Sequence, residues 1–256
     1  MRKRVSAAVA TGALALTGLA IPAAHAAPAE EEIKLSNIKV NGGKDVAIGT
    51  GNKKFTLTFD ASHSSNIEAN PSISAWKGSS GILLPDGFLR DQCKEVSATK
   101  SSCTATFNVN PQDYDIDNSE AGTWSTEVFI SAQYPSSAYL DKSNIKSFKV
   151  LRAAKLTTNA APEPIKKGKT LTVTGALTRA NWDTFKYGGY TAQSVKLQFK
   201  KQGAATYTDV KTVKSDSRGN LKTTVKATVD GSYRYSFAGT STTPAVNASG
   251  DAVNVT

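Results

Sequence analysis

Catalytic side chains are scarce in this chain of 256 residues, which has two histidines and two cysteines. A Ser–His–Asp hydrolase needs a histidine base beside its nucleophile, and no Gly-x-Ser-x-Gly elbow accompanies His63. His63 lies in the polar segment Ala61–Ser65, where we expect an exposed loop histidine. No spacing marks out a carboxylate pair for glycoside hydrolysis. We therefore expect that the protein is not an enzyme and has no catalytic residues.

The two cysteines, Cys93 and Cys103, predict a disulfide. Their pairing would close a loop of about eleven residues and stabilise the fold by roughly 2.5–3 kcal/mol. A tetrahedral metal site needs four ligands, which these cysteines and His63 cannot supply. Paired cysteines indicate an oxidising compartment and leave no thiol nucleophile.

An acidic run between two expected strands offers the oxygen ligands that Ca²⁺ prefers. Its candidate ligands are Asp113, Asp115, Asp117 and Glu120. The run begins like a calcium loop, but Asn118 stands at the glycine position and Trp124 at the final glutamate position. We expect a solvated loop, with weak Ca²⁺ binding as the alternative and no other cofactor.

Positive charge is concentrated in the second half. Residues 151–256 contain 16 Lys and Arg against 6 Asp and Glu, whereas residues 27–150 contain 12 against 15. A basic half joined to a near-neutral one indicates an anionic partner for the basic half.

Six cations form the predicted polyanion-binding set. Lysines alternate with apolar residues in 195–199 and 221–229, so they should lie on outer faces of a sandwich. Lysines also solubilise such faces and protect edge strands, and this ordinary role is the alternative. The set is Lys196, Lys200, Lys222, Lys226, Arg218 and Arg234, which Lys211 and Lys214 would extend.

The elements that position these residues are short strands. Phe55, Leu57 and Phe59 alternate with polar residues, and similar alternation recurs along the chain with Gly-rich turns between. One pattern occurs twice, as Gly122-Thr123-Trp124 and Gly231-Ser232-Tyr233. Each reads as a turn glycine followed by an aromatic residue that enters a strand and anchors a core.

The second half resembles an immunoglobulin-like module common in secreted proteins of actinobacteria, without an assigned function. The matching segments are Thr170–Gly175, Arg179–Trp182, Tyr187–Tyr190, Val195–Phe199 and Asp230–Arg234. The first half is similar, more weakly, to a companion domain of unknown function, through the cysteine pair and Gly122-Thr123-Trp124. The resemblance implies fold and secretion and brings no catalytic residues. Trp182, Tyr187 and Tyr190 are expected to form a packed cap over one end of the second sandwich, with a sugar-stacking platform as the alternative.

The N-terminus predicts a signal peptide. Three cationic residues precede an apolar stretch over 5–21, and Ala24-His25-Ala26 fits a cleavage site after Ala26 on the Sec route. The alternative, a membrane anchor, suits the stretch poorly because Thr, Gly and Pro interrupt it. The expected organisation is all-β: signal peptide 1–26, mobile leader 27–32, a disulfide-containing β-sandwich 33–150 and a basic β-sandwich 151–256, both immunoglobulin-like.

The resulting expectation is a secreted, extracellular, non-catalytic protein. Its basic second sandwich would associate with a cell-wall polymer or another extracellular polyanion in the cell envelope. The alternative is that the chain inhibits a secreted, extracellular hydrolase, such as a protease. It would do so by presenting the loop Gly78–Asp91 to that enzyme.

Overall fold

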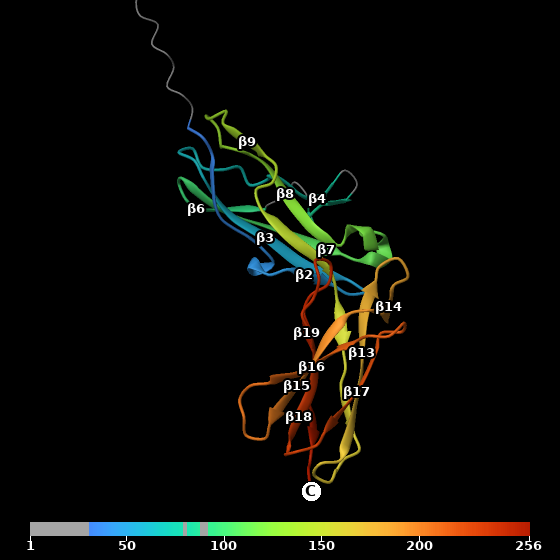
Figure 1. The fold of residues 1–256 in the computed structure, drawn as a ribbon. Coiled ribbons are helices and arrows are strands. Elements are labelled where there is room, and N and C mark those ends of the chain that lie inside the picture. Colours follow the sequence, from blue (N-terminus) through green and yellow to red (C-terminus); the bar gives the residue numbers. More distant parts are fainter. Residues whose placement is uncertain (1–30, 79–80, 88–91) are drawn as a thin grey trace, which may run out of the picture. The chain divides into compact units, whose positions relative to one another are not determined.

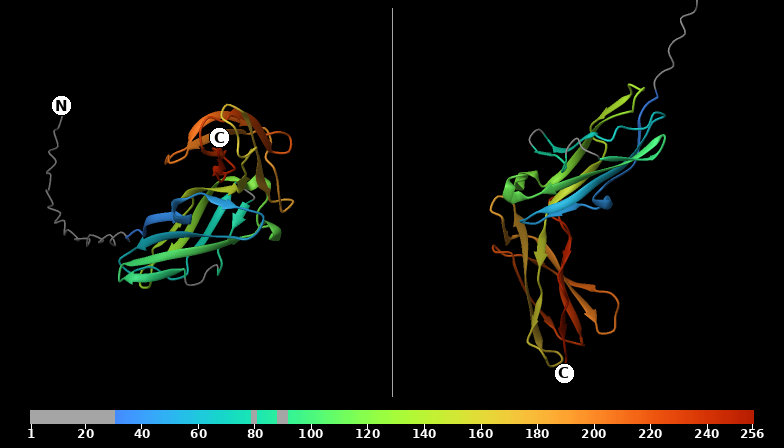
Figure 2. Two further views of the ribbon diagram at one scale, coloured as in Figure 1. Left: turned by 90° about the horizontal axis from the view of Figure 1, so that it is seen from below. Right: turned by 180° about the vertical axis from the view of Figure 1, so that it is seen from behind.

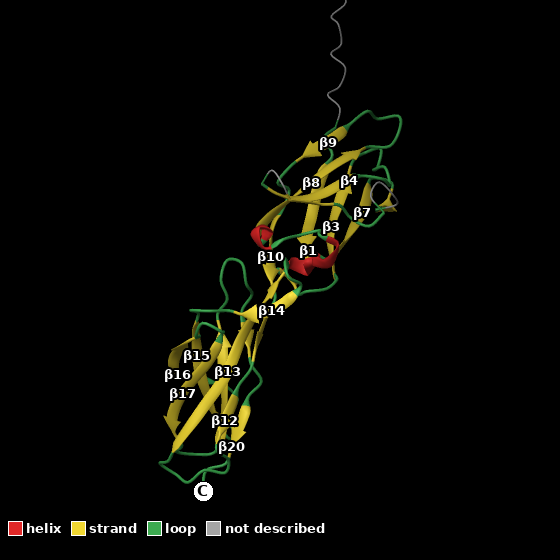
Figure 3. Cartoon of the chain, turned by 90° about the vertical axis from the view of Figure 1, so that its right-hand side faces the viewer, coloured by secondary structure: helices red, strands yellow, loops and turns green. Residues whose placement is uncertain are grey.

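The computed structural model describes residues 31–78, 81–87 and 92–256. Strands form every long element in these residues, and the helical segments are three short 3-10 turns, drawn red in Figure 3. They are η1 (Asn41–Gly43), η2 (Pro111–Asp113) and η3 (Asn118–Glu120). In the described residues no helix is long and apolar enough to cross a membrane. The predicted signal peptide, its cleavage site and residues 27–30 of the leader lie outside the described residues.

The first sandwich consists of two sheets (Figure 1). One has the order β1-β3-β7-β6, with β1 (Lys34–Val40), β3 (Lys53–Ser62), β7 (Lys100–Val109) and β6 (Cys93–Ser97). The other has the order β2-β10-β8-β4-β5, with β2 (Val46–Ile48), β10 (Ser147–Arg152), β8 (Gly122–Ser131), β4 (Ser72–Lys77) and β5 (Gly81–Leu83). In addition, β9 (Tyr139–Lys142) pairs with β8, and β2 runs parallel to β10.

The second sandwich also consists of two groups of strands, seen from two further sides in Figure 2. Around β13 (Thr170–Asn181) lie β11 (Ala154–Leu156), β12 (Asn159–Ala161), β14 (Lys186–Gly189) and β17 (Asn220–Lys226). The other sheet has the order β16-β15-β18-β19, with β16 (Thr208–Lys214), β15 (Ser194–Lys201), β18 (Gly231–Phe237) and β19 (Val246–Asn247). The last strand, β20 (Asp251–Val253), pairs with β18.

The strand orders are those of immunoglobulin-like sandwiches. In such folds the first, second, fifth and fourth strands form one sheet, and the remaining strands form the other. The order β1-β3-β7-β6 reproduces the first sheet in full, and β12-β13-β17 reproduces it without the fourth strand. The predicted fold class, an all-β pair of tandem immunoglobulin-like sandwiches, is confirmed.

Both glycine–aromatic patterns begin equivalent strands. Gly122 opens β8 and Gly231 opens β18, each in the central part of its sheet. Trp124 and Tyr233 are 1% and 6% exposed, so the prediction that they anchor cores is confirmed. At Gly231 a Cβ atom would lie 2.4 Å from the carbonyl oxygen of Lys200, so only glycine fits this close approach of two strands.

Each sandwich has its own buried cluster. The first includes Phe55 and Phe107, whose rings stack 5.0 Å apart, and the second is centred on Tyr235, Leu197 and Val173. These residues alternate with exposed ones along their strands, as expected from a period of two. The boundary predicted at 150/151 falls inside β10, and it stays a prediction.

Candidate functional site

The disulfide lies between neighbouring strands of one sheet. Cys93 on β6 and Cys103 on β7 are directly opposite each other and are bonded. Both are buried, so the bond fastens an edge strand to the sheet interior. The predicted disulfide is confirmed.

His63 is buried, and the expectation of an exposed loop histidine is wrong. The residue is 3% exposed and follows the end of β3. Its Nδ1 accepts a hydrogen bond from the backbone N–H of Ser65 at 3.0 Å, so Nε2 carries the proton and donates to the carbonyl oxygen of Glu31 at 2.9 Å. The imidazole satisfies backbone groups where the strand ends, which is a structural role.

The four acidic residues of the predicted calcium loop are not gathered around one point. The Asp117 carboxylate caps η3 by accepting a hydrogen bond from the backbone N–H of Ser119, and the Glu120 carboxylate accepts one from the backbone N–H of Asp117. Hydrogen bonds to the Asp117 carboxyl from the Ser119 hydroxyl, which contributes most, and from the Ser119 backbone N–H lower the pKa of that carboxyl. Asp113 and Asp115 instead bind Asn110. No group of three or more His, Cys, Asp or Glu in the described residues is placed to hold a metal ion, and Ca²⁺ binding stays a prediction.

The acidic segment contacts residues from the end of β13. Asn118 accepts from the N–H of Trp182 at 3.0 Å and donates to the side chain of Asn181 at 2.8 Å. The Trp182 ring is 1% exposed and its Nε1 donates to the carbonyl oxygen of Ile48 at 3.2 Å. Trp182 is therefore packed, as expected, but among the core residues of the first sandwich rather than as a cap on the second.

Three of the six predicted cations share the outer face of the paired strands β15 and β18: Lys196, Lys200 and Arg234. The guanidinium of Arg234 lies 3.9 Å from the ring centroid of Tyr207, and the Nζ of Lys200 lies 5.1 Å from it. Lys196 instead forms an ion pair with Asp209 at 2.5 Å, and this hydrogen bond lowers the pKa of the Asp209 carboxyl. Lys200 and Arg234 are the uncompensated charges of this face.

The other three predicted cations lie elsewhere. Lys222 and Lys226 are exposed on β17, in the opposite sheet, and the Nζ of Lys226 donates to the Thr170 hydroxyl at 3.0 Å. Arg218 lies in the turn before β17. The structure therefore divides the set between two outer faces and a turn and does not form one patch from it.

Most carboxylates of the second sandwich accept hydrogen bonds from backbone N–H groups. Four accept from backbone N–H groups: Asp183 from Asn118, Asp216 from Arg218, Asp230 from Val255 and Asp251 from Ala160. A fifth, Asp209, binds Lys196, and that is the only ion pair of the described residues in this half. Apart from Lys196, no cation of residues 151–256 forms an ion pair within the described part of the chain.

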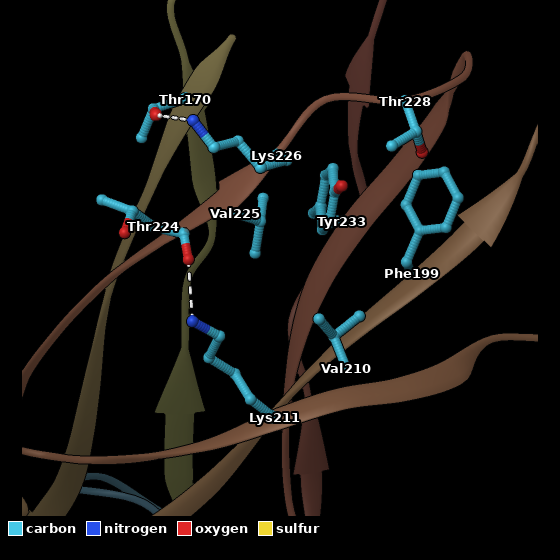
Figure 4. Close-up of a pocket in the computed structure, with 9 residues that line it drawn as sticks. All are labelled: Thr170, Phe199, Val210, Lys211, Thr224, Val225, Lys226, Thr228 and Tyr233. Atoms are coloured by element: carbon cyan, nitrogen blue, oxygen red, sulfur yellow. Dashed lines mark hydrogen bonds between the residues drawn. The ribbon is translucent and has the colours of Figure 1, made fainter. Parts of the chain in front are cut away.

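A groove of about 500 Å³ opens between β16 and β17 (Figure 4). Its apolar lining comes from Phe199, Val210, Val225 and Tyr233, which project from four different strands or their ends. Lys211 crosses it and donates to the carbonyl oxygen of Thr224 at 2.8 Å.

The sequence did not predict this groove. Val210 is 43% exposed, next to a register shift in the β15–β16 pairing. β16 has no buried residue, so no apolar alternation marks it as the wall of a site.

The strand orders and the two buried clusters define the class of molecule, a pair of immunoglobulin-like sandwiches. No family model matches the sequence, and no curated protein matches it. Among solved structures the chain is similar to dimeric latent PorU from Porphyromonas gingivalis, with a TM-score of 0.32, 8% identity, and 92% of this chain and 21% of that one covered.

Two further solved structures resemble the chain to a similar degree. The ectodomain of mouse nectin-like molecule 4 has a TM-score of 0.29 and 13% identity, with 86% and 65% of the two chains covered. The adhesin InvE of Yersinia pseudotuberculosis has a TM-score of 0.28 and 15% identity, with 87% and 59% covered. This chain spans less than two thirds of each of these three proteins. At such distances the likeness carries no functional argument.

Proposed function

We propose that the protein is a secreted, non-catalytic binding protein whose second sandwich associates with an anionic polymer of the cell envelope or with another extracellular polyanion. The observation that supports this most is the uncompensated charge of residues 151–256, where 16 cations face 6 acidic residues. Because Lys196 is the one cation of this half that forms an ion pair within the described residues, the other positive charges have no acidic group in direct contact.

The outer face of β17 is the better of the two candidate surfaces. Lys222 and Lys226 are both exposed there, and neither has an acidic partner among the described residues. On the β15–β18 face Asp209 cancels one cation, and Tyr207 orders the other two by contact with their charged ends. A polymer that follows the β17 face would meet two like charges four residues apart, about 13 Å along the strand.

Co-sedimentation of the mature chain with purified cell-wall material tests the proposal. We expect retention that falls steeply as NaCl rises from about 50 to about 300 mM, because neutralised cations release counterions. The variant Lys222→Glu/Lys226→Glu should lose most of this retention. Lys54→Glu/Lys149→Glu is the matched control, since both lysines are exposed on strands of the first sandwich and the change in charge is equal.

The competing proposal is inhibition of an extracellular hydrolase through the loop Gly78–Asp91. Ile82 and Leu84 favour it, because these apolar side chains are 64% and 54% exposed; residues 79–80 and 88–91 lie outside the described residues. If this proposal holds, the added protein slows secreted proteases, and both charge-reversal variants inhibit as well as the unchanged chain.

A further inference from the structure

The second sandwich ends at an unpaired strand edge where the first has a further strand. In the first sandwich, β7 pairs with β3 on one side and β6 on the other. Its equivalent in the second sandwich is β17, which pairs over seven residue positions with β13. No other strand in the described part of the chain pairs with β17.

The backbone groups at this edge can be assigned from the hydrogen bonds on either side of β17. The N–H of Ala227 donates to Lys169, and Gly219 accepts from Leu177, so odd-numbered residues point toward β13. Successive residues of a strand alternate in direction. The N–H and C=O groups of Lys222, Thr224 and Lys226 therefore point to the free edge. The bond from Lys211 to the Thr224 oxygen agrees with this assignment.

The groove lies directly beside that edge. Val225 faces inward with Tyr233 and Phe199, and Val210 forms the opposite wall on β16 (Figure 4). A strand added to β17 would turn every second side chain into this space. The volume of about 500 Å³ is large enough to receive two medium-sized apolar side chains.

The other side chains of an added strand would lie on the outer face. On that face, these outward side chains would lie opposite Lys222, Thr224 and Lys226. The same three residues supply the backbone groups that would bind the added strand. Cross-strand neighbours of opposite charge stabilise a sheet, and like charges destabilise it. The outward positions opposite the two lysines therefore favour Asp or Glu.

We propose that the edge of β17 binds an extended acidic segment of a partner protein as an additional antiparallel strand. The register assigns it a five-residue pattern: acidic, apolar, any residue, apolar, acidic. The two apolar positions stand opposite Val225 and Thr223, and the two acidic ones opposite Lys226 and Lys222. This site goes beyond the polymer-binding proposal because it uses backbone hydrogen bonds and a groove as well as charge.

Lys211 protects this edge when it is empty. Its ammonium group supplies, within the described residues, the one hydrogen bond to the outward backbone groups of Lys222, Thr224 and Lys226. Lysine is a common means of preventing edge strands from pairing indiscriminately. An incoming strand replaces this single bond with a ladder of backbone bonds.

The test uses the full mature chain and a labelled peptide that contains Glu-Val-Thr-Val-Glu, with fluorescence anisotropy as the measurement. Thr224→Pro removes an edge N–H without touching the β13 ladder, because proline is tolerated where the N–H faces away from the sheet. Thr224→Val keeps that N–H and is the matched control. We expect Thr224→Pro to weaken peptide binding at least tenfold and Thr224→Val to change it less than twofold.

Two further measurements test the proposal even if the Thr224→Pro variant does not fold. Amide hydrogen exchange should slow at Lys222, Thr224 and Lys226 when the peptide is bound. Lys222→Glu/Lys226→Glu should lose the Glu-Val-Thr-Val-Glu peptide and gain affinity for Lys-Val-Thr-Val-Lys. Absence of peptide binding at millimolar concentration overturns the proposal, and so does binding to a folded Thr224→Pro variant that equals binding to the unchanged chain.

Self-association that protects the same amides without peptide would assign the edge to a second copy of this chain and would also overturn the proposal. Polymer retention separates the two proposals, because Thr224→Pro changes no charge. If peptide binding is absent while retention on wall material persists, the edge site fails alone. If retention fails while the peptide binds, the polymer proposal fails alone.

Discussion

At the scale of single residues, Tyr235 combines a polar group with complete burial. Its side chain is fully buried in the second core, and its hydroxyl donates to the carbonyl oxygen of Val173 at 3.0 Å. Burial raises the pKa of the phenol from an ordinary value of 10.0 to about 12. Burial therefore stabilises the neutral phenol of Tyr235 relative to the phenolate in the folded chain.

This pKa difference predicts an alkaline loss of stability. Between pH 10.0 and about 12 the phenol ionises in the unfolded chain before it does in the folded one, so its contribution is complete below pH 10.0 and disappears as pH rises toward 12. The full difference corresponds to about 3 kcal/mol. Tyr235→Phe should cost about 1 kcal/mol at neutral pH through the lost hydrogen bond, yet should be the more stable protein near pH 12.

Urea unfolding of both proteins at several pH values measures this crossover. Parallel stability curves for the unchanged chain and the Phe variant across the alkaline range would contradict it. The two proteins share every other tyrosine and lysine, so the difference between the curves isolates Tyr235.

Single residues also show where sequence reasoning failed. His63 stands among serines, which suggested an exposed loop, but it is buried and both ring nitrogens have backbone partners, on Ser65 and Glu31. Backbone partners come from the way the chain folds back, and local composition does not record them. Trp182 was expected to pack in a cap over one end of the second sandwich, but its hydrogen-bond partner Ile48 is 134 residues away in the first sandwich.

At the scale of elements, the disulfide holds the strand that the second sandwich lacks. It joins β6 to β7, and the equivalent edge of β17 is bare. The residues at both ends of this bond are buried, so β6 is fixed as part of the sheet rather than as a loose edge.

Reduction of the bond should therefore destabilise the first sandwich. We expect the free energy of unfolding to fall by roughly 2–3 kcal/mol, as the chain-entropy account gives for a loop of this length. Denaturant unfolding with and without a reducing agent measures the effect while leaving all side-chain volumes unchanged. Cys93→Ala/Cys103→Ala should lose at least as much and should not respond to the reductant. Unchanged stability of the reduced wild-type chain would contradict the expectation.

Much of the strand content was predictable, because it depends on a local pattern. Phe55, Leu57 and Phe59 alternate with polar residues, and the structure places them on one buried face of β3. Gly122 and Gly231 marked the starts of equivalent strands. Strand pairing depends on contacts between distant segments, so neither the missing fourth strand nor the groove beside β17 could be predicted.

The candidate site was predictable in composition but not in arrangement. Alternation predicted that Lys222 and Lys226 lie on an outer face, and they do. It did not show that Lys196 and Lys200 belong to the opposite sheet, since the sheet of a strand depends on its partner rather than its own residues. Alternation also gave no sign that Asp209 would cancel the charge of Lys196.

At the scale of the whole molecule, the two sandwiches share a strand order and differ in charge. Residues 27–150 carry a small acidic excess, and residues 151–256 carry a large basic one. Such a difference does not decide the fold, because surface charge is compatible with either sign on an outer sheet face. It predicts that a polyanion would bind the second half rather than the first.

The binding of soluble polyphosphate to the mature chain at increasing NaCl tests whether the second sandwich binds polyanions. We expect log K to fall linearly with log salt, with a slope reduced by about two in Lys222→Glu/Lys226→Glu and unchanged in Lys54→Glu/Lys149→Glu. Binding that ignores salt, or a slope that changes only when the first sandwich is altered, would contradict it.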